Sequence, residues 1–393
     1  MRSLQGLGYR HGQTDVMERP AQTNNESQPS GQLIEALIGH LTPPAESDSP
    51  DPAPWDQAFP REAWKKLGQA GLLGLSVPRE LGGGGLSYPG FCRATTAVAE
   101  HGCHLGLAVS WLMQNLVAAN YFGRYASPAQ AARYLEPLLS GESLIAIATS
   151  EPQGGAHPKY LSTKAERQPD GFLIDGQKAF VTHAPQAAAF IVLCVTETLG
   201  RRKQFSALVV PSDAPGLVVE PSADFALMRP VGHGGLTLKG CAVPGDALLG
   251  PEGQALDMLA KPFRALEEVT LSAFALGQIR TLLRNATHWP SVADTEESAE
   301  ALGRLRAKLS QLELAVEAAA QRLEGKPTAP VAVELAAARE AATGFIELYR
   351  RLATDLGASV DGTTLGTFEM FFLRGARKGF RRLGQKLMSN EVS

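Results

Sequence analysis

Two adjacent glutamates, Glu267 and Glu268, stand in the helix-forming segment "ALEEVTLSAFALG". A carboxylate held in an apolar, dry site has a raised pKa and can act as a general base near neutral pH. Neighbouring helical residues differ by about 100° around the axis, so the two side chains cannot face the same way. Glu267 borders an apolar stripe that includes Leu266 and Val269, whereas Glu268 points further away. Because such a pair most often forms a solvated face, the pattern alone leaves both interpretations open.

A second candidate is the segment "IATSEPQGGAHPK", residues 147–159, which runs from small apolar residues into a Ser-Glu-Pro step and a Gly pair. It is either a chain reversal between strands or a turn shaped around a ligand. Thr149 and Ser150 in this segment, and Thr182 in "AFVTH", offer hydroxyl groups to such a ligand. Threonine and serine also occur on strands for ordinary reasons of β propensity, so this pattern is not specific by itself.

The elements that must position these residues follow three compositional regimes. Before about residue 140, apolar residues recur three and four apart, which predicts buried helices. Seven short β-branched runs separated by Gly and Pro then predict an antiparallel β-domain. The last regime is helical again, and about four long helices indicate an up-down bundle. The predicted domains are a disordered leader (1–30), a helical domain (31–142), a β-domain (143–250) and a helical bundle (251–393).

Length and composition exclude several classes of protein. A chain of 393 residues is longer than one hydrophobic core usually supports, so more than one domain is expected. The net charge of -3 creates no positive electrostatic field that would attract nucleic acid. No apolar run approaches the ~20 residues of a membrane span, and the polar start has no secretory apolar region. Four cysteines without metal-type spacing favour a reducing, cytoplasmic location and no metal site.

The order of these regimes and the motifs inside them resemble the acyl-CoA dehydrogenase family of flavoproteins. "YLEPLLSGESLIAIATSEPQGG" and "GFLIDGQKAFVTH" are similar to the family's L-x-x-L-x-x-G-E, T-E-P and G-x-K-x-x-I-T elements. "AGLLGLSVPRELGGGGLSYPG" looks like its helix-to-loop segment ahead of a GG-x-G-L step, and "LVVPSDAPGLVV" matches its later β-domain. The resemblance runs from about Gln32 to the C-terminus and is thinnest in the last regime.

The resemblance implies a fold, a cofactor and a reaction. The fold would be α+β, mainly α, with an N-terminal helical domain, a middle antiparallel β-domain and a C-terminal four-helix bundle. Members of the family oxidise acyl-CoA thioesters to 2-enoyl-CoA, with FAD as hydride acceptor and a carboxylate as base. They form dimers or tetramers, and an electron-transfer flavoprotein-like acceptor would reoxidise the flavin. This chain would accordingly be a homo- or hetero-oligomer without nucleic acid or a membrane span.

The same resemblance assigns roles to individual residues. Thr149 and Ser150 would lie at the pyrimidine edge of the flavin, Phe180 would cover a ring face, and Thr182 would bond near N5. Glu267 falls on the position of the base in the smaller group of members that carry it on the first bundle helix.

Other positions depart from the family pattern. The commoner site of the base is replaced by Leu383-Gly384-Gln385, and the usual R-x-x-R-x-x-F-G segment reads "RNATHWPSVADTEE". Ala156 and His157 stand in the substrate-contacting turn where a hydroxyl and a carboxylate are expected, while Arg374 matches a family arginine that could contact substrate. Each lost contact is worth about 1–3 kcal/mol. The departures favour a rival hypothesis, a non-catalytic subunit that pairs with an active paralogue, and a flavin monooxygenase on the same fold is a weaker third.

Overall fold

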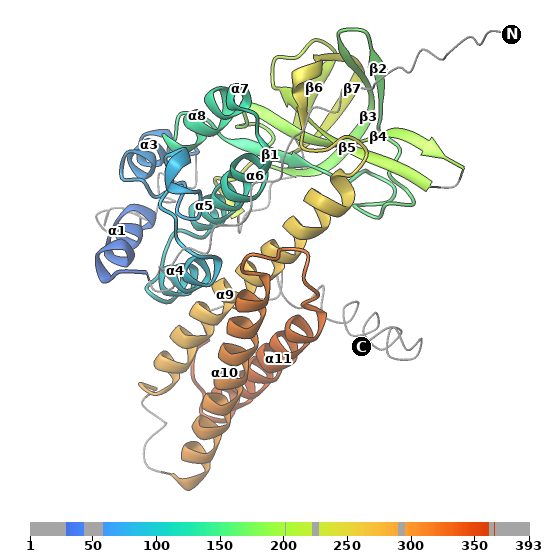
Figure 1. The fold of residues 1–393 in the computed structure, drawn as a ribbon. Coiled ribbons are helices and arrows are strands. Elements are labelled where there is room, and N and C mark those ends of the chain that lie inside the picture. The colour runs from blue at the N-terminus through green and yellow to red at the C-terminus, as the bar shows by residue number, and fades with distance from the viewer. Residues whose placement is uncertain are drawn as a thin grey trace, which may run out of the picture.

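The computed structural model describes residues 29–42, 58–200, 202–221, 228–289, 295–360 and Leu365. Figure 1 shows three parts in chain order: a group of helices, a twisted sheet, and long helices that extend away from both. The predicted fold class, α+β and mainly α with a β-domain between two helical parts, is confirmed. The predicted leader, apart from its last two residues, lies outside the described residues.

The N-terminal part is built from short and medium helices joined by tight turns. They are α1 (Gly31–Leu41), α3 (Arg61–Gln69), η1 (Arg79–Leu81), α4 (Tyr88–Glu100), α5 (Leu105–Val117), η2 (Ala118–Phe122), α6 (Gly123–Tyr125), α7 (Pro128–Gln130), η3 (Ala131–Leu135) and α8 (Glu136–Leu139). Ser127 followed by Pro128 predicts a helix N-cap, and the structure confirms it: the Ser127 hydroxyl accepts from Gln130 N at 3.2 Å, and Gln130 Oε1 accepts from Ser127 N at 2.9 Å. This reciprocal pair satisfies two backbone donors and fixes the start of α7.

The helical periodicity of "FCRATTAVAEHGCHLGLAVSW" predicts a near-continuous helix, but the structure has two helices there. The chain breaks between α4 and α5, where Gly102 has a φ of 79°, a left-handed conformation that glycine adopts readily. His104 then starts α5, because its ring nitrogen accepts from Leu107 N at 3.4 Å. The backbone N–H of His104 donates to Leu41 O at 2.8 Å, so the break is fixed by a contact with α1.

The middle part is a sheet that, within the described residues, has eight strands. They are β1 (Ile145–Ala148), β2 (Lys164–Gln168), β3 (Gly171–Thr182), β4 (Ala189–Leu199), β5 (Arg202–Pro211), β6 (Leu217–Pro221), β7 (His233–Pro244) and β8 (Leu248–Leu249). The strand order is β6-β7-β3-β2-β4-β5-β8, and β1 pairs with β4. Most neighbours are antiparallel as predicted, but β1 and β2 both run parallel to β4, a direction that side-chain alternation does not encode.

The C-terminal part contains three long described helices. A short turn η5 (Gly245–Ala247) and a π-helical turn η6 (Leu256–Ala260) lead into α9 (Lys261–Ala286), which is followed by α10 (Glu296–Leu323) and α11 (Ala332–Asp355). The predicted fourth helix, around residues 363–388, lies outside the described residues except for Leu365. Among the described helices, none is both long and apolar enough to cross a membrane.

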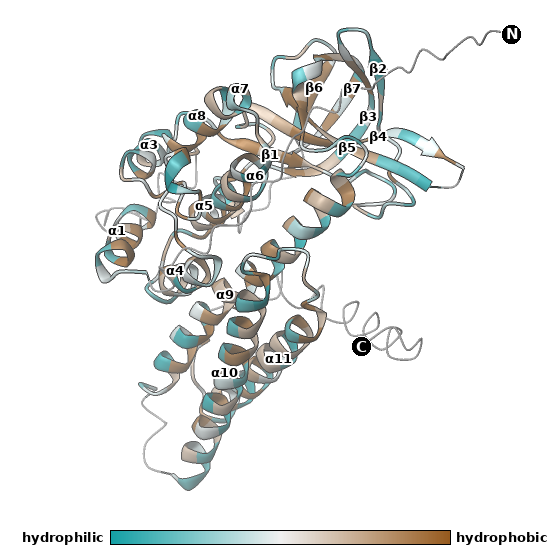
Figure 2. Ribbon diagram, in the orientation of Figure 1, coloured by the Kyte–Doolittle hydropathy of each residue, from teal (hydrophilic) through white to brown (hydrophobic). Residues whose placement is uncertain are grey.

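The core joins the three parts through strand β4. Ile191 and Leu193 belong to the cluster shared with the helices, whereas Phe190, Val192 and Cys194 pack on the opposite side of the sheet. Since both faces of β4 are covered, its sequence is a continuous apolar run rather than an alternating one. Figure 2 shows the consequence, because the sheet is brown through its middle and teal toward the free end of the β4–β5 hairpin.

Close contact between α4 and α9 gives a first testable prediction. A Cβ placed at Gly277 of α9 would overlap the backbone oxygen of Thr96 on α4, which cannot move without shifting that helix. We expect Gly277→Ala to lower the free energy of unfolding by about 1–3 kcal/mol, measured by urea denaturation. The matched control is Gly303→Ala on α10, where nothing lies within 4 Å and better helix propensity should add up to about 1 kcal/mol. Equal effects of the two substitutions would contradict this packing.

Candidate active site

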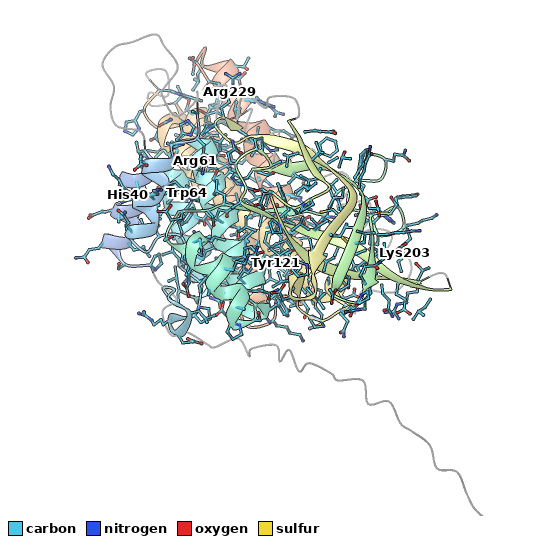
Figure 3. All side chains as sticks on the ribbon, turned by 90° about the horizontal axis from the view of Figure 1, so that it is seen from above. His40, Arg61, Trp64, Tyr121, Lys203 and Arg229 are labelled. Atoms are coloured by element: carbon cyan, nitrogen blue, oxygen red, sulfur yellow. The ribbon has the colours of Figure 1, made fainter. Side chains whose placement is uncertain are left out.

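A cavity of about 670 Å³ lies where the sheet meets α5, η2 and the start of α9. Its walls include every cofactor residue expected from the sequence, Thr149, Ser150, Phe180 and Thr182, and also Glu267. Figure 3, a view from above, places Tyr121 of η2 between the N-terminal helices and the strands, at the same junction. Residues more than 140 positions apart in the chain are therefore brought to one space.

Thr149 and Ser150 continue β1 along the cavity wall. Their backbone oxygens are used within the fold: Thr149 O accepts from Lys178 Nζ at 3.2 Å, and Ser150 O accepts from Ala179 N at 2.9 Å. Their hydroxyl groups find no hydrogen-bond partner in the part of the chain that the structure describes. Both side chains are half-buried and line the cavity, so their hydroxyls remain available to a bound molecule.

Glu151, a residue to which the sequence analysis gives no role, holds the turn after Ser150 through hydrogen bonds and an ion pair. Glu151 and Gly155 exchange two backbone hydrogen bonds of 3.0 Å, which shapes the turn. The Glu151 carboxylate accepts from the backbone N–H and hydroxyl groups of Ser162 and Thr163 at 2.7–2.9 Å, and lies 3.0 Å from Lys178 Nζ. Burial raises its pKa, but Lys178 and these donors outweigh burial and lower the pKa to about 2.

Phe180 reaches the cavity through a bulge in β3. The pairing register with β7 shifts between Lys178 and Val181, and Phe180 sits in that interval with a φ of 58°. Phe180 is 67% exposed, whereas the other exposed residues of the strand, Asp175 and Gln177, are polar. A large side chain held in a left-handed conformation and turned toward open space is a costly arrangement that clusters at ligand sites.

His183 is a second residue that the sequence did not indicate. It follows Thr182, has a φ of 66°, and is 2% exposed against the cavity wall. Ser110 Oγ donates to Gly106 O at 2.9 Å and lies 2.8 Å from His183 Nε2, so the imidazole N–H must be the donor of the second bond. Burial, followed by His233, lowers the pKa of His183 to about 3, which keeps the ring neutral.

Glu267 faces the cavity from the first turns of α9. Burial and, after it, the charge of the neighbouring Glu268 raise its pKa to about 7, while Arg264 acts in the opposite direction. This is the pKa that a general base needs near neutral pH.

Glu268 is held by two arginines, which distinguishes it from its neighbour. Its carboxylate pairs with Arg264 at 2.9 Å along α9 and with Arg339 of α11 at 3.2 Å. It also borders the cavity, but its charge is balanced there, whereas Glu267 has no ion pair within the described residues. Of the two glutamates, Glu267 is therefore the one free to exchange a proton.

Of the two expected substrate contacts, Ala156 and Arg374, only Ala156 lies among the described residues. Ala156 lies at the exposed rim of the cavity beside His157, where its methyl group offers packing but no hydrogen bond. Arg374 lies outside the described residues, as do residues 290–294 of the departing segment "RNATHWPSVADTEE".

The cavity meets the general requirements of a flavin ring system. Its volume is within the roughly 300–1,000 Å³ of small-molecule and cofactor sites. The cavity is lined by the free hydroxyls of Thr149 and Ser150 and by the exposed aromatic ring of Phe180, which could stack on a bound ring. Apolar side chains such as Val117 and Tyr121 also line it, and this combination of apolar walls with few polar groups is typical of cofactor sites.

Comparisons with known proteins show a family likeness in the first two parts of the chain. The family descriptions "Acyl-CoA dehydrogenase, N-terminal domain" and "Acyl-CoA dehydrogenase, middle domain" match residues 45–142 and 146–241. Isovaleryl-CoA dehydrogenase, mitochondrial, of Oryza sativa subsp. japonica is 31% identical over 62% of this chain and 59% of its own length. The short-chain specific acyl-CoA dehydrogenase, mitochondrial, of Homo sapiens is 29% identical over 60% of this chain and 56% of its own length. The matches thus span less than three fifths of these relatives.

Solved structures extend the likeness of fold to nearly the whole chain. Butyryl-CoA dehydrogenase from Megasphaera elsdenii superposes with a TM-score of 0.73 at 19% identity, covering 90% of this chain and 97% of that one. A structure described as PigA with FAD and proline gives a TM-score of 0.72 at 17% identity, over 92% and 98%. At such identities the likeness concerns the fold.

Proposed function

Because the chain belongs to the acyl-CoA dehydrogenase family, we propose that it binds FAD and oxidises an acyl-CoA thioester to the 2-enoyl-CoA. The observation that carries the proposal is the position of Glu267, a carboxylate with a pKa of about 7 that lines one cavity with the free hydroxyls of Thr149 and Ser150. The named activities of the relatives support the same substrate class.

The chain's own residues divide the work of the reaction. Above its pKa, the Glu267 carboxylate removes a proton from the carbon next to the thioester carbonyl and retains it as the acid. Thr149, Ser150 and Thr182 would hold the polar edge of the cofactor, and Phe180 would cover a ring face. When bound, FAD would supply the acceptor for the hydride equivalent that leaves the adjacent β-carbon. The apolar walls exclude water and keep the base in its raised pKa range.

Several further features belong to the same proposal. We retain the domain limits 1–30, 31–142, 143–250 and 251–393, a cytoplasmic location, and assembly into dimers or tetramers. An electron-transfer flavoprotein-like protein is the proposed acceptor, and Ala156 and Arg374 stay proposed substrate contacts. The four cysteines of the described part are free thiols, which accords with a reducing compartment.

A second candidate function is a non-catalytic subunit that pairs with an active paralogue. Ala156 and His157 favour it, because the rim of the cavity lacks the hydroxyl and carboxylate expected there. The visible spectrum of the protein purified alone separates the two. The enzyme hypothesis predicts a yellow flavoprotein, either as isolated or after addition of FAD. A colourless protein that takes up no FAD would favour the subunit hypothesis.

Substitutions at the cavity edge test the cofactor assignment more finely. We expect Thr182→Val and Phe180→Ala each to raise the Kd of FAD about 5- to 100-fold, since one hydrogen bond or ring contact is worth roughly 1–3 kcal/mol. Thr198→Val and Leu199→Ala at the exposed end of β4 are matched controls and should leave the Kd unchanged. Flavin fluorescence titration measures the constants. Unchanged affinity in both cavity variants would contradict the assignment.

A further inference from the structure

Two cavities lie on either side of one aromatic pair. Phe263 lines both the 670 Å³ cavity and a second cavity of about 260 Å³. The ring of Tyr121 lies 5.1 Å from the ring of Phe263, centroid to centroid, at an interplanar angle of 53°. Both residues are more than nine-tenths buried, with exposed fractions of 3% and 6%. The two rings therefore form a packed wall between the cavities.

Two π-helical turns carry or adjoin these rings, because Tyr121 belongs to η2 and Phe263 follows the end of η6 by three residues. In η2, Tyr121 lines the first cavity while the preceding Asn120 lines the second. In η6, Leu256 lines the first cavity and Met258 lines the second. Tyr125, in the helix α6 that directly follows η2, donates through its Oη to Met258 O at 3.0 Å and so links that helix to η6. Widened turns of this kind are rare and recur at functional sites.

The wall stands close to the proposed base. Phe263 precedes Glu267 by four residues on α9, a rise of about 6 Å, and lies on the same face of the helix. Tyr121 and Glu267 line the same cavity, and burial followed by the Glu267 charge raises the pKa of the Tyr121 phenol. A substrate whose α-carbon lies at Glu267 therefore has room for only a few more carbons before the rings.

We infer that Tyr121 and Phe263 end the acyl-binding space and restrict the site to short-chain acyl-CoA thioesters. This inference rests on the proposed function. A longer chain would have to displace a buried ring, and close-packed side chains resist such displacement. Removing the Phe263 ring would join the two cavities and admit a longer chain into the second one.

The test measures binding, so that it does not depend on turnover. S-butyl-, S-octyl- and S-dodecyl-CoA thioethers lack the carbonyl that activates the α-proton and serve as unreactive probes. Isothermal titration of the FAD-loaded protein should give S-butyl-CoA at least about tenfold tighter binding than S-dodecyl-CoA. Phe263→Ala should tighten S-dodecyl-CoA binding at least about tenfold. Phe263→Leu should give a smaller change in the same direction, and it guards against a folding defect in the alanine variant.

Tyr121→Phe is the matched control, because it removes the hydroxyl and keeps the ring. Its ratio of S-butyl to S-dodecyl affinity should equal that of the wild type. Equal affinity of the wild type for all three probes, or an unchanged S-butyl to S-dodecyl ratio in both Phe263 variants, would contradict the inferred limit on chain length. If no thioether binds at any length, the proposed function is wrong and the inference is wrong with it. If the thioethers bind but that ratio is unchanged in the Phe263 variants, only the inferred limit on chain length is wrong.

Discussion

Glu267→Gln is expected to slow reduction of the flavin by acyl-CoA roughly 10²- to 10⁴-fold, the usual contribution of a general base. Glutamine keeps the size and polarity of the side chain but cannot accept the α-proton. Single-turnover reduction under anaerobic conditions measures this step directly. FAD affinity should stay within about twofold, because Glu267 is assigned to the substrate and not to the cofactor.

The pH dependence of the wild type follows from the same residue. With a pKa of about 7, Glu267 is about half ionised at neutral pH, so the rate should rise through pH 7 and then level off. Its folded pKa lies above the ordinary value of 4.5, so the folded protein binds the extra proton between these values. The extra proton adds up to about 3 kcal/mol to the free energy of unfolding. This contribution is fully present below pH 4.5 and is lost as the pH rises through about 7. Glu267→Gln should lack both transitions.

Glu268→Gln is the matched control for Glu267→Gln. It is expected to retain a rate well above that of Glu267→Gln, because Glu268 is paired with Arg264 and Arg339. Since the Glu268 charge raises the pKa of Glu267, the rate profile should move to lower pH. A loss in Glu268→Gln as large as in Glu267→Gln would contradict the assignment of the base.

Lys178→Met is expected to lower the free energy of unfolding by about 3–5 kcal/mol, because it leaves the buried Glu151 charge without its partner. Lys178 is 2% exposed and Glu151 5% exposed, so water cannot replace the lost ammonium group. The turn that follows Ser150 should loosen as well, and FAD affinity should fall with it. Urea denaturation at neutral pH measures the first effect, and flavin titration measures the second.

Two further variants make this test specific. Lys239→Met removes an exposed lysine from the neighbouring strand β7 and should change stability by less than about 0.5 kcal/mol. The double variant Glu151→Gln/Lys178→Met should be more stable than Lys178→Met alone, since no unpaired charge remains. In the wild type, the depressed pKa of Glu151 means that its contribution is present above pH 4.5 and lost as the pH falls through about 2. A Lys178→Met variant as stable as Lys239→Met would contradict this account.

Local patterns are enough to predict the three parts of the fold. The cap at Ser127, the change of period at β1 and the apolar run of β4 each depend on neighbouring residues, and each is visible in the sequence. Thr149, Phe180 and Glu267 were found by resemblance, and they do share one cavity.

The features that were missed depend on contacts between distant residues. The break at Gly102 is fixed by α1, and the parallel pairing of β1 depends on where β4 lies. Glu151 is buried only because Ser162, Thr163 and Lys178 converge on it, and no local pattern signals that convergence. A histidine after a strand, such as His183, likewise gives no sign of the serine that orients it.

One measurement tests the central claim most directly: anaerobic addition of butyryl-CoA to the FAD-loaded protein while the visible flavin band is recorded. The account predicts bleaching of that band in the wild type, formation of the 2-enoyl-CoA, and loss of fast bleaching in Glu267→Gln. A wild-type protein that binds FAD and butyryl-CoA yet keeps an unbleached spectrum, or a Glu267→Gln variant that bleaches at the wild-type rate, would contradict it.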